Sequence, residues 1–132
     1  IIWLMANFFD LISRIFISSI FLLSGYNKIF NYENTFEWME GFGIPGFLLW
    51  PTIVLEIVLP ILIIIGYQTQ ISAILLAMFC VATAVIFHLD FANQMQTIAF
   101  LKNFALAGGF LFIAVHGPKE WSMERKKKYV RL

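Results

Sequence analysis

Three charged side chains lie inside apolar stretches of this chain that are each long enough to cross a lipid bilayer: Arg14, Glu56 and Lys102. A charge held at the centre of a bilayer costs about 3 kcal/mol or more. Such residues therefore usually face the interior of a protein, where they pair or line a polar pathway. In this chain they indicate either a buried ion pair or a site for a polar ligand or a proton.

Arg14 and Glu56 are expected to pair with each other. They lie in consecutive apolar stretches, which run antiparallel across a bilayer and so bring the two side chains to similar depths. The long arginine side chain can cover a mismatch of several ångströms. The pair could serve only to fix how two helices dock, or it could form a site for a polar ligand or a proton, and the sequence leaves both interpretations open.

Other polar residues indicate a cavity at one end of these stretches. Lys28 follows Arg14 on the same helical face, His88 ends the third stretch, and Lys102 is followed by Asn103 in the fourth. The cations would attract an anion, and Glu56 or His88 could move a proton. We predict a polar pocket that opens outward with Glu56 at its floor, and its candidate residues are Arg14, Lys28, Glu56, His88, Lys102 and Asn103.

The composition identifies the elements that must position these residues as membrane helices. Of 132 residues, 61% are hydrophobic and 13% are charged, whereas soluble domains carry roughly 25% charged residues. A water-soluble domain of this size could not bury so much apolar surface. We therefore predict an all-α integral membrane protein. The net charge of +1 does not indicate a nucleic-acid partner.

Four spans are predicted, at about 7–25, 46–66, 70–88 and 97–116, and together they form one transmembrane domain over residues 1–132. Gly66 can end the second span in a left-handed cap, and Pro118 cannot continue the fourth. The first apolar run lacks a basic leading region and a small-residue cleavage site, so we expect it to remain as a span. The predicted fold is a four-helix membrane bundle.

The long connection 26–45 is predicted to hold a short interfacial helix. Asn34 could cap this helix with Glu37 at the third position of a capping box, and Trp38 favours the level of the lipid head groups. A plain connecting loop is the alternative. In the second span, Pro60 cannot donate a hydrogen bond to the carbonyl of Glu56, which predicts a helix kink beside that carboxylate.

The basic residues of the segment 119–132 predict the orientation of the bundle. Positively charged segments flanking spans stay in the cytoplasm, so both chain termini are expected there and the connection 26–45 is expected outside. The basic tail could bind anionic lipids or could act only as an orientation signal. We expect a multi-pass protein of the bacterial inner membrane.

Several kinds of chemistry have no residues here to support them. Cys80 is the single cysteine, so the chain has no CxxC pair. His88 and His116 are expected at opposite ends of the bundle, and no HExxH motif is present, so no metal site is predicted. The residues alone predict no cofactor.

The order of these residues resembles the DoxX family of small four-helix bacterial membrane proteins. The resemblance covers nearly the whole chain and rests on Arg14, Gly25-Tyr26-Asn27-Lys28, Gly43-Ile44-Pro45, Glu56, Gly66, His88, Leu101-Lys102-Asn103 and Gly108-Gly109. In that family an arginine often follows the glycine that ends the second span. Here Gln68 and Gln70 stand in that turn instead.

The resemblance implies a link to quinone and redox assemblies, because the family takes its name from a subunit of a thiosulfate:quinone oxidoreductase. We expect a subunit or partner of such an assembly that is not catalytic alone, embedded in the lipid bilayer beside a redox enzyme or further copies of itself. One alternative is a thiosulfate:quinone oxidoreductase-type enzyme subunit. A second is a small-solute or lipid carrier, which Pro60 in a charged span would suit.

Overall fold

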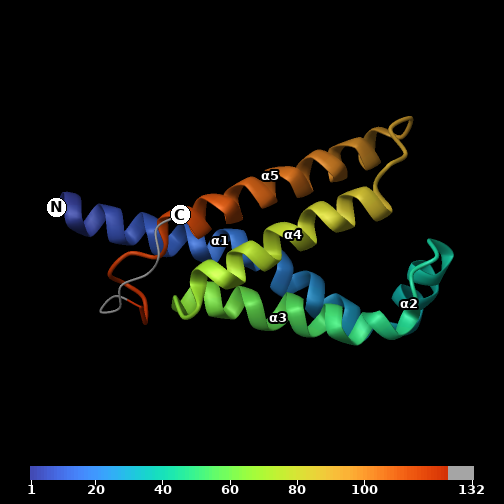
Figure 1. Cartoon of the computed structure of the whole chain (residues 1–132), viewed down its shortest axis with the longest axis horizontal. Coiled ribbons are helices and arrows are strands. Elements are labelled where there is room, and N and C mark those ends of the chain that lie inside the picture. Colours follow the sequence, from blue (N-terminus) through green and yellow to red (C-terminus); the bar gives the residue numbers. More distant parts are fainter. Residues whose placement is uncertain (125–132) are drawn as a thin grey trace.

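The computed structural model describes residues 1–124, and these form helices joined by short connections (Figure 1). Four of the helices, with the short η1 counted together with α3, are long and apolar enough to cross a membrane. The predicted all-α membrane bundle with a short helix in its first connection is therefore confirmed. In chain order the elements are α1 (Ile2–Phe30), α2 (Tyr32–Gly41), η1 (Gly46–Leu48), α3 (Leu49–Ile65), α4 (Thr69–Phe87) and α5 (Gln94–His116).

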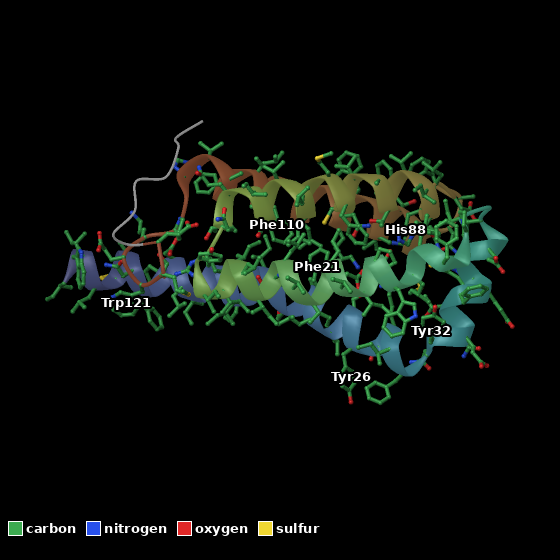
Figure 2. All side chains as sticks on the ribbon, turned by 60° about the horizontal axis from the view of Figure 1, so that its bottom comes forward. Phe21, Tyr26, Tyr32, His88, Phe110 and Trp121 are labelled. Carbon is green, nitrogen blue, oxygen red and sulfur yellow. The ribbon has the colours of Figure 1, made fainter. Side chains whose placement is uncertain are left out.

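The long helices pack as two antiparallel pairs. α1 runs along α3, α4 runs along α5, and contacts between α3 and α4 join the pairs. Phe21 of α1 meets the edge of Phe110 of α5 in the middle of the bundle, with 5.4 Å between the ring centroids (Figure 2). Around this contact lies a core of small and branched side chains: Ile63, Ala73, Leu76, Ala77, Cys80, Ala107 and Ala114.

The outer surface of the bundle is apolar, as contact with lipid requires. Phe16 of α1 and Phe112 of α5 expose 70% and 67% of their surface. Large exposed apolar side chains recur along all four spans. In a bilayer these side chains lie in lipid, which is as apolar as they are.

α1 is longer than the predicted span 7–25. Its 29 residues extend about 43 Å at 1.5 Å per residue, compared with about 30 Å for the hydrocarbon core of a bilayer. Its first turns extend beyond the other helices (Figure 1). Gly25, taken from the sequence as an end, lies inside the helix, which continues to Phe30.

α2 is the predicted short helix, but it begins earlier than expected. Its first residue is Tyr32, and Asn31 is its N-cap without a side-chain hydrogen bond. The backbone N–H of Thr35 already donates to the carbonyl of Asn31, so Asn34 lies within the first turn. The predicted cap at Asn34 with Glu37 is therefore wrong.

The other helix ends have clear local causes. Gly66 ends α3 with φ of 75°, in the left-handed region that favours glycine. Asn93 caps α5, because its side-chain oxygen accepts from the backbone N–H groups of Met95 and Gln96. This cap starts α5 at Gln94, three residues before position 97. Pro60 lies inside α3, which continues through it to Ile65.

After α5, the chain turns at Gly117 and runs back across the end of the bundle to residue 124. The predicted basic tail begins in this segment. Its residues 125–132 lie outside the described residues.

Candidate functional site

Lys28 of α1 and Glu56 of α3 form an ion pair. Lys28 Nζ donates to both carboxylate oxygens, at 2.9 and 3.0 Å, and to Ser24 Oγ at 2.7 Å. Glu56 is buried, with 2% of its surface exposed. Its partner is thus Lys28, and the predicted pair of Arg14 with Glu56 is wrong.

The packing of α1 on α3 explains this exchange of partners. Gly25 lies so close to α3 that a Cβ atom placed there would be 3.3 Å from Glu56 Cβ. This close approach brings Lys28, one turn further along α1, to the carboxylate. Arg14 lies against Ile63 and Ile64 instead, which are about 12 Å along α3 from Glu56 at 1.5 Å per residue. The predicted pairing assumed similar depths for Arg14 and Glu56, whereas Arg14 lies level with the C-terminal end of α3.

A cavity of about 400 Å³ lies between the two helix pairs at the α2 end of the bundle. Most of its wall is apolar, and Phe21, Met39 and Phe79 contribute to it. Five of the six residues predicted for the polar pocket border it. They are Lys28, Glu56, His88, Lys102 and Asn103.

The polar groups around this cavity differ in how fully they are paired. His88 Nδ1 lies 2.8 Å from Gln96 Oε1 and donates a hydrogen bond to it. Asn103 donates to Thr83 Oγ1 at 3.2 Å, so its carbonyl oxygen keeps its capacity to accept. Lys102 has no ion-pair or hydrogen-bond partner within residues 1–124. Since Lys28 and Glu56 compensate each other, the cavity carries one uncompensated positive charge.

Aromatic side chains of α2 and of its C-cap residue, Phe42, cover the cavity at the end of α4. Trp38 stacks on Phe87, with 4.4 Å between centroids and 21° between planes. Phe42 meets Phe87 edge-on at 5.0 Å. Thr35, Trp38 and Met39 border the cavity from this side. The amphipathic α2 therefore covers this end of the cavity.

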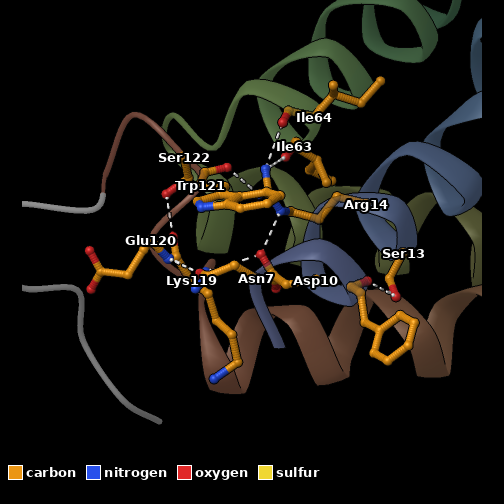
Figure 3. Close-up of polar contacts among 11 residues, drawn as sticks. Asn7, Asp10, Ser13, Arg14, Ile63, Ile64, Lys119, Glu120, Trp121 and Ser122 are labelled. Atoms are coloured by element: carbon orange, nitrogen blue, oxygen red, sulfur yellow. Dashed lines mark hydrogen bonds and ion pairs between the residues drawn. The ribbon is translucent and has the colours of Figure 1, made fainter. Parts of the chain in front are cut away.

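Arg14 lies at the other end of the bundle from this cavity and does not border it. Its contacts are with Asp10, the end of α3 and the segment that follows α5 (Figure 3). Arg14 is 1% exposed. Its Nε pairs with Asp10 at 3.0 Å, and its Nη1 donates to the carbonyls of Ile63 and Ile64 at 3.1 and 2.6 Å. Its Nη2 donates to the carbonyl of Trp121 at 2.6 Å. Arg14 thus holds a helix end and a terminal segment together.

This arrangement satisfies the carbonyl groups that the end of α3 leaves without helical partners. Arg14 takes those of Ile63 and Ile64, and the backbone N–H groups of Met123 and Glu124 donate to Ile65 and Gly66. Asn7 Oδ1 accepts from the N–H of Glu120, and Asp10 accepts from that of Lys119. We call the segment 117–124 the clasp. Arg14 is therefore a structural residue of the clasp.

The sequence predictions missed several residues that bind the polar groups of the cavity and of the clasp. Ser24 and Gln96 were not singled out, because a serine or glutamine in such a stretch carries no signal. Asp10 did carry one, since an acid four residues before an arginine lies on the same helical face.

The remaining reactive side chains lie apart from one another. Cys80 is buried in the core. His116 packs on Phe112 at the clasp end, with 4.2 Å between ring centroids, far along the bundle from His88. Among residues 1–124, no three histidine, cysteine or acidic side chains are grouped so that they could hold a metal ion.

Comparisons with known proteins agree with one another. The DoxX family model matches residues 9–89. The chain is 37% identical to "Inner membrane protein YqjF" of Escherichia coli strain K12 over 115 residues, which cover 87% of this chain and 88% of the relative. It is 34% identical to "Inner membrane protein YphA" of the same organism over 123 residues, 88% of each chain. No solved structure matches the chain significantly.

Proposed function

The chain belongs to the DoxX family, and we propose that it is a non-catalytic membrane subunit or partner of a quinone-linked redox assembly. It is a multi-pass protein of the inner membrane, as its relatives and its four apolar helices indicate. Its part in the assembly would be to hold a quinone ring in the cavity beneath α2.

The single observation that carries this proposal is the cavity itself. Ligand pockets are mostly apolar, measure roughly 300–1,000 Å³, and contain a few convergent polar groups. This one measures about 400 Å³ and combines apolar and aromatic walls with the side chains of Lys28, His88, Lys102 and Asn103.

A quinone ring fits these groups chemically. It is flat and apolar on both faces, and its two carbonyl oxygens accept hydrogen bonds. Lys102 has an ammonium group that no described residue engages, so it is the donor we assign to one oxygen. Asn103 borders the same space, and the second N–H of its amide, beside the one that Thr83 accepts, is the donor available to the other oxygen. A bound quinone would supply electron-accepting chemistry, and these residues would only hold and orient it.

Trp38 provides a direct test, because it borders the cavity and quinones quench indole fluorescence. The protein is placed in lipid nanodiscs with Trp3, Trp50 and Trp121 changed to phenylalanine, and a benzoquinone is titrated. We expect saturable quenching, weakened about tenfold by Lys102→Met, as loss of a charge-assisted hydrogen bond predicts. Lys119→Met removes a cation at the clasp end and should leave the affinity unchanged. Quenching that does not saturate, or that both variants weaken equally, would refute the proposal.

The assembly itself is tested separately by gentle purification from native membranes. An oxidoreductase should be recovered with the protein. Recovery of the protein always alone would contradict a role as a subunit or partner.

The uncompensated charge of Lys102 favours one alternative, a thiosulfate:quinone oxidoreductase-type enzyme subunit, because a cation in an apolar cavity attracts an anion. The pure protein would then reduce quinone when thiosulfate is added. Absence of turnover in protein that binds quinone would exclude this alternative and favour the non-catalytic role.

We also propose that both chain ends face the cytoplasm and that α2 faces outward. Four spans put the two ends on one side, and the residues after α5 are strongly basic. An impermeant maleimide added to intact spheroplasts should label Glu37→Cys of α2 and spare Lys119→Cys. The native Cys80 is buried and adds little background. Labelling only at position 119 would reverse the orientation.

A further inference from the structure

A groove bordered by α1, α2 and Lys102 of α5 joins the cavity from the side. It measures about 690 Å³ and shares Ile20, Ser24, Lys28, Thr35, Trp38 and Lys102 with the cavity wall. These shared residues make the groove the mouth of the cavity. Lys102 stands at the junction of the two spaces.

The polarity of this groove changes along its length. Asn27, Asn31 and Asn34 border one end, and Ile20 and Leu23 border the other. A groove with a polar end and an apolar end matches a molecule that has an oxygen-bearing head and a hydrocarbon tail.

The groove opens toward the bilayer rather than toward water. α1 and α5 meet through Phe21 and Phe110 in the middle of the bundle, and beyond this contact Lys102 of α5 faces α1 across the groove. Leu23 is 60% exposed and Ile20 is 38% exposed, so these apolar side chains face lipid. On the other side, the stacked rings of Trp38 and Phe87 close the cavity beneath α2.

From this geometry we infer that the ligand of the cavity is a lipid-soluble quinone that enters from the bilayer between α1 and α5 and leaves its isoprenoid tail along Ile20 and Leu23. The inference rests on the proposed function and narrows its ligand class from quinones in general to tailed ones. Lys102 borders both the groove and the cavity, so its ammonium group would bind the quinone head where the two spaces join. A water-soluble quinone would use the cavity but not the groove.

A variant that alters only the groove separates the contribution of the tail to binding from that of the head. Leu23 borders the groove but not the cavity, and Leu23→Phe would fill the space that the tail needs. The probes are a benzoquinone without a tail and the same ring with an isoprenoid tail, titrated into nanodiscs of the protein that keeps only Trp38. Leu111→Phe is the matched control, because Leu111 of α5 is exposed to lipid and borders neither space.

We expect Leu23→Phe to weaken binding of the tailed quinone about fivefold or more while the tail-free ring keeps its affinity within about twofold. Leu111→Phe should change neither. Unchanged binding of the tail-free ring also shows that the variant is folded. If Leu23→Phe affects both probes equally, or neither, the lateral route is wrong while the proposed function stands. If the unaltered cavity binds neither quinone, the proposed function fails as well.

Discussion

Lys28 and Glu56 form an ion pair that is buried on one side only. Nζ of Lys28 lies 2.9 and 3.0 Å from the two carboxylate oxygens. The side chain of Lys28 remains 22% exposed, whereas that of Glu56 is 3% exposed. Loss of the partner would therefore leave the Glu56 carboxylate in an apolar interior, whereas the Lys28 ammonium group would keep access to its surroundings.

This asymmetry predicts different costs for removing each partner. Lys28→Met leaves a carboxylate unpaired in an apolar interior, and we expect the free energy of unfolding to fall by about 3–5 kcal/mol. Glu56→Gln leaves a lysine that can turn toward the α1–α5 groove, so the loss should be only about 1–3 kcal/mol. Unfolding in mixed detergent micelles measures both.

The double variant Lys28→Met with Glu56→Gln is the control for this comparison. It removes both charges and should be more stable than Lys28→Met alone. Equal costs for the two single variants would contradict the one-sided burial of the pair.

The second prediction concerns Arg14 and the clasp. Arg14→Met removes the hydrogen bonds to Ile63, Ile64 and Trp121, so we expect a loss of about 2–4 kcal/mol. Amide hydrogen exchange should accelerate first in the segment 117–124. Arg14→Lys should rescue little, since an ammonium group cannot reproduce the fork of donors that reaches three carbonyl groups and Asp10.

Ser13→Ala is the matched control on the neighbouring residue. Ser13 is exposed, and within residues 1–124 its hydroxyl bonds to the carbonyl of Phe9 in its own helix and to no other group. Its removal should leave exchange in the clasp unchanged. Exchange in Arg14→Met that rises uniformly along the chain would show that the clasp is not held by Arg14 in particular.

The class of fold could be predicted from the sequence, whereas the partners of its charges could not. Apolar runs of bilayer length leave no other architecture open, because lipid offers the backbone no hydrogen-bond partners. The partner of Glu56 depends instead on how far α1 is shifted along α3. Arg14 and Lys28 are about 21 Å apart along α1 at 1.5 Å per residue, so the level of α1 on α3 decides which of them reaches the carboxylate.

That shift is set by contacts which the sequence does not show. The contact of Gly25 with Ile57 fixes the level of α1 on α3. From the sequence alone, a glycine inside an apolar stretch can equally well mark the end of a helix or a close contact within it. The grouping of Lys28, His88, Lys102 and Asn103 could be predicted, because it needs only the order of the spans. The groove beside them could not, since it depends on how α1, α2 and Lys102 of α5 are spaced.

The third prediction tests Gly25 directly. An added Cβ would lie 2.7 Å from Ile57 Cδ1, so Gly25→Ala should destabilise the bundle by about 1–3 kcal/mol through overpacking. It should also weaken the Lys28–Glu56 pair. Adding Ile57→Val, which removes Cδ1, should recover part of the loss.

Gly108→Ala is the control, because an added Cβ at this position in α5 meets no atom of the described residues within 4 Å. There the change should be neutral or should stabilise the helix by up to about 1 kcal/mol. Similar losses at both glycines would mean that helix flexibility, rather than close packing on α3, explains the requirement at position 25.

The fourth prediction separates backbone strain from docking of the clasp. Gly43 and Gly66 both have positive φ, of 80° and 75°, so an alanine at either position costs about 1–2 kcal/mol of left-handed strain. At Gly43 an added Cβ meets no atom within 4 Å, whereas at Gly66 it would overlap Ser122 Cβ. Gly66→Ala should therefore lower the free energy of unfolding more than Gly43→Ala does. It should also release the clasp from the end of α3.

Proteolysis at the clasp and the free energy of unfolding are measured for both variants. Cleavage within 117–124 should rise in Gly66→Ala and not in Gly43→Ala. Ser122→Gly, which removes the overlapping Cβ, should bring Gly66→Ala closer to the cost of Gly43→Ala. Because strain is common to the two glycines, any excess at position 66 that Ser122→Gly relieves measures how strongly the clasp is bound to the end of α3. Equal costs and equal cleavage would show that the clasp does not rest on Gly66.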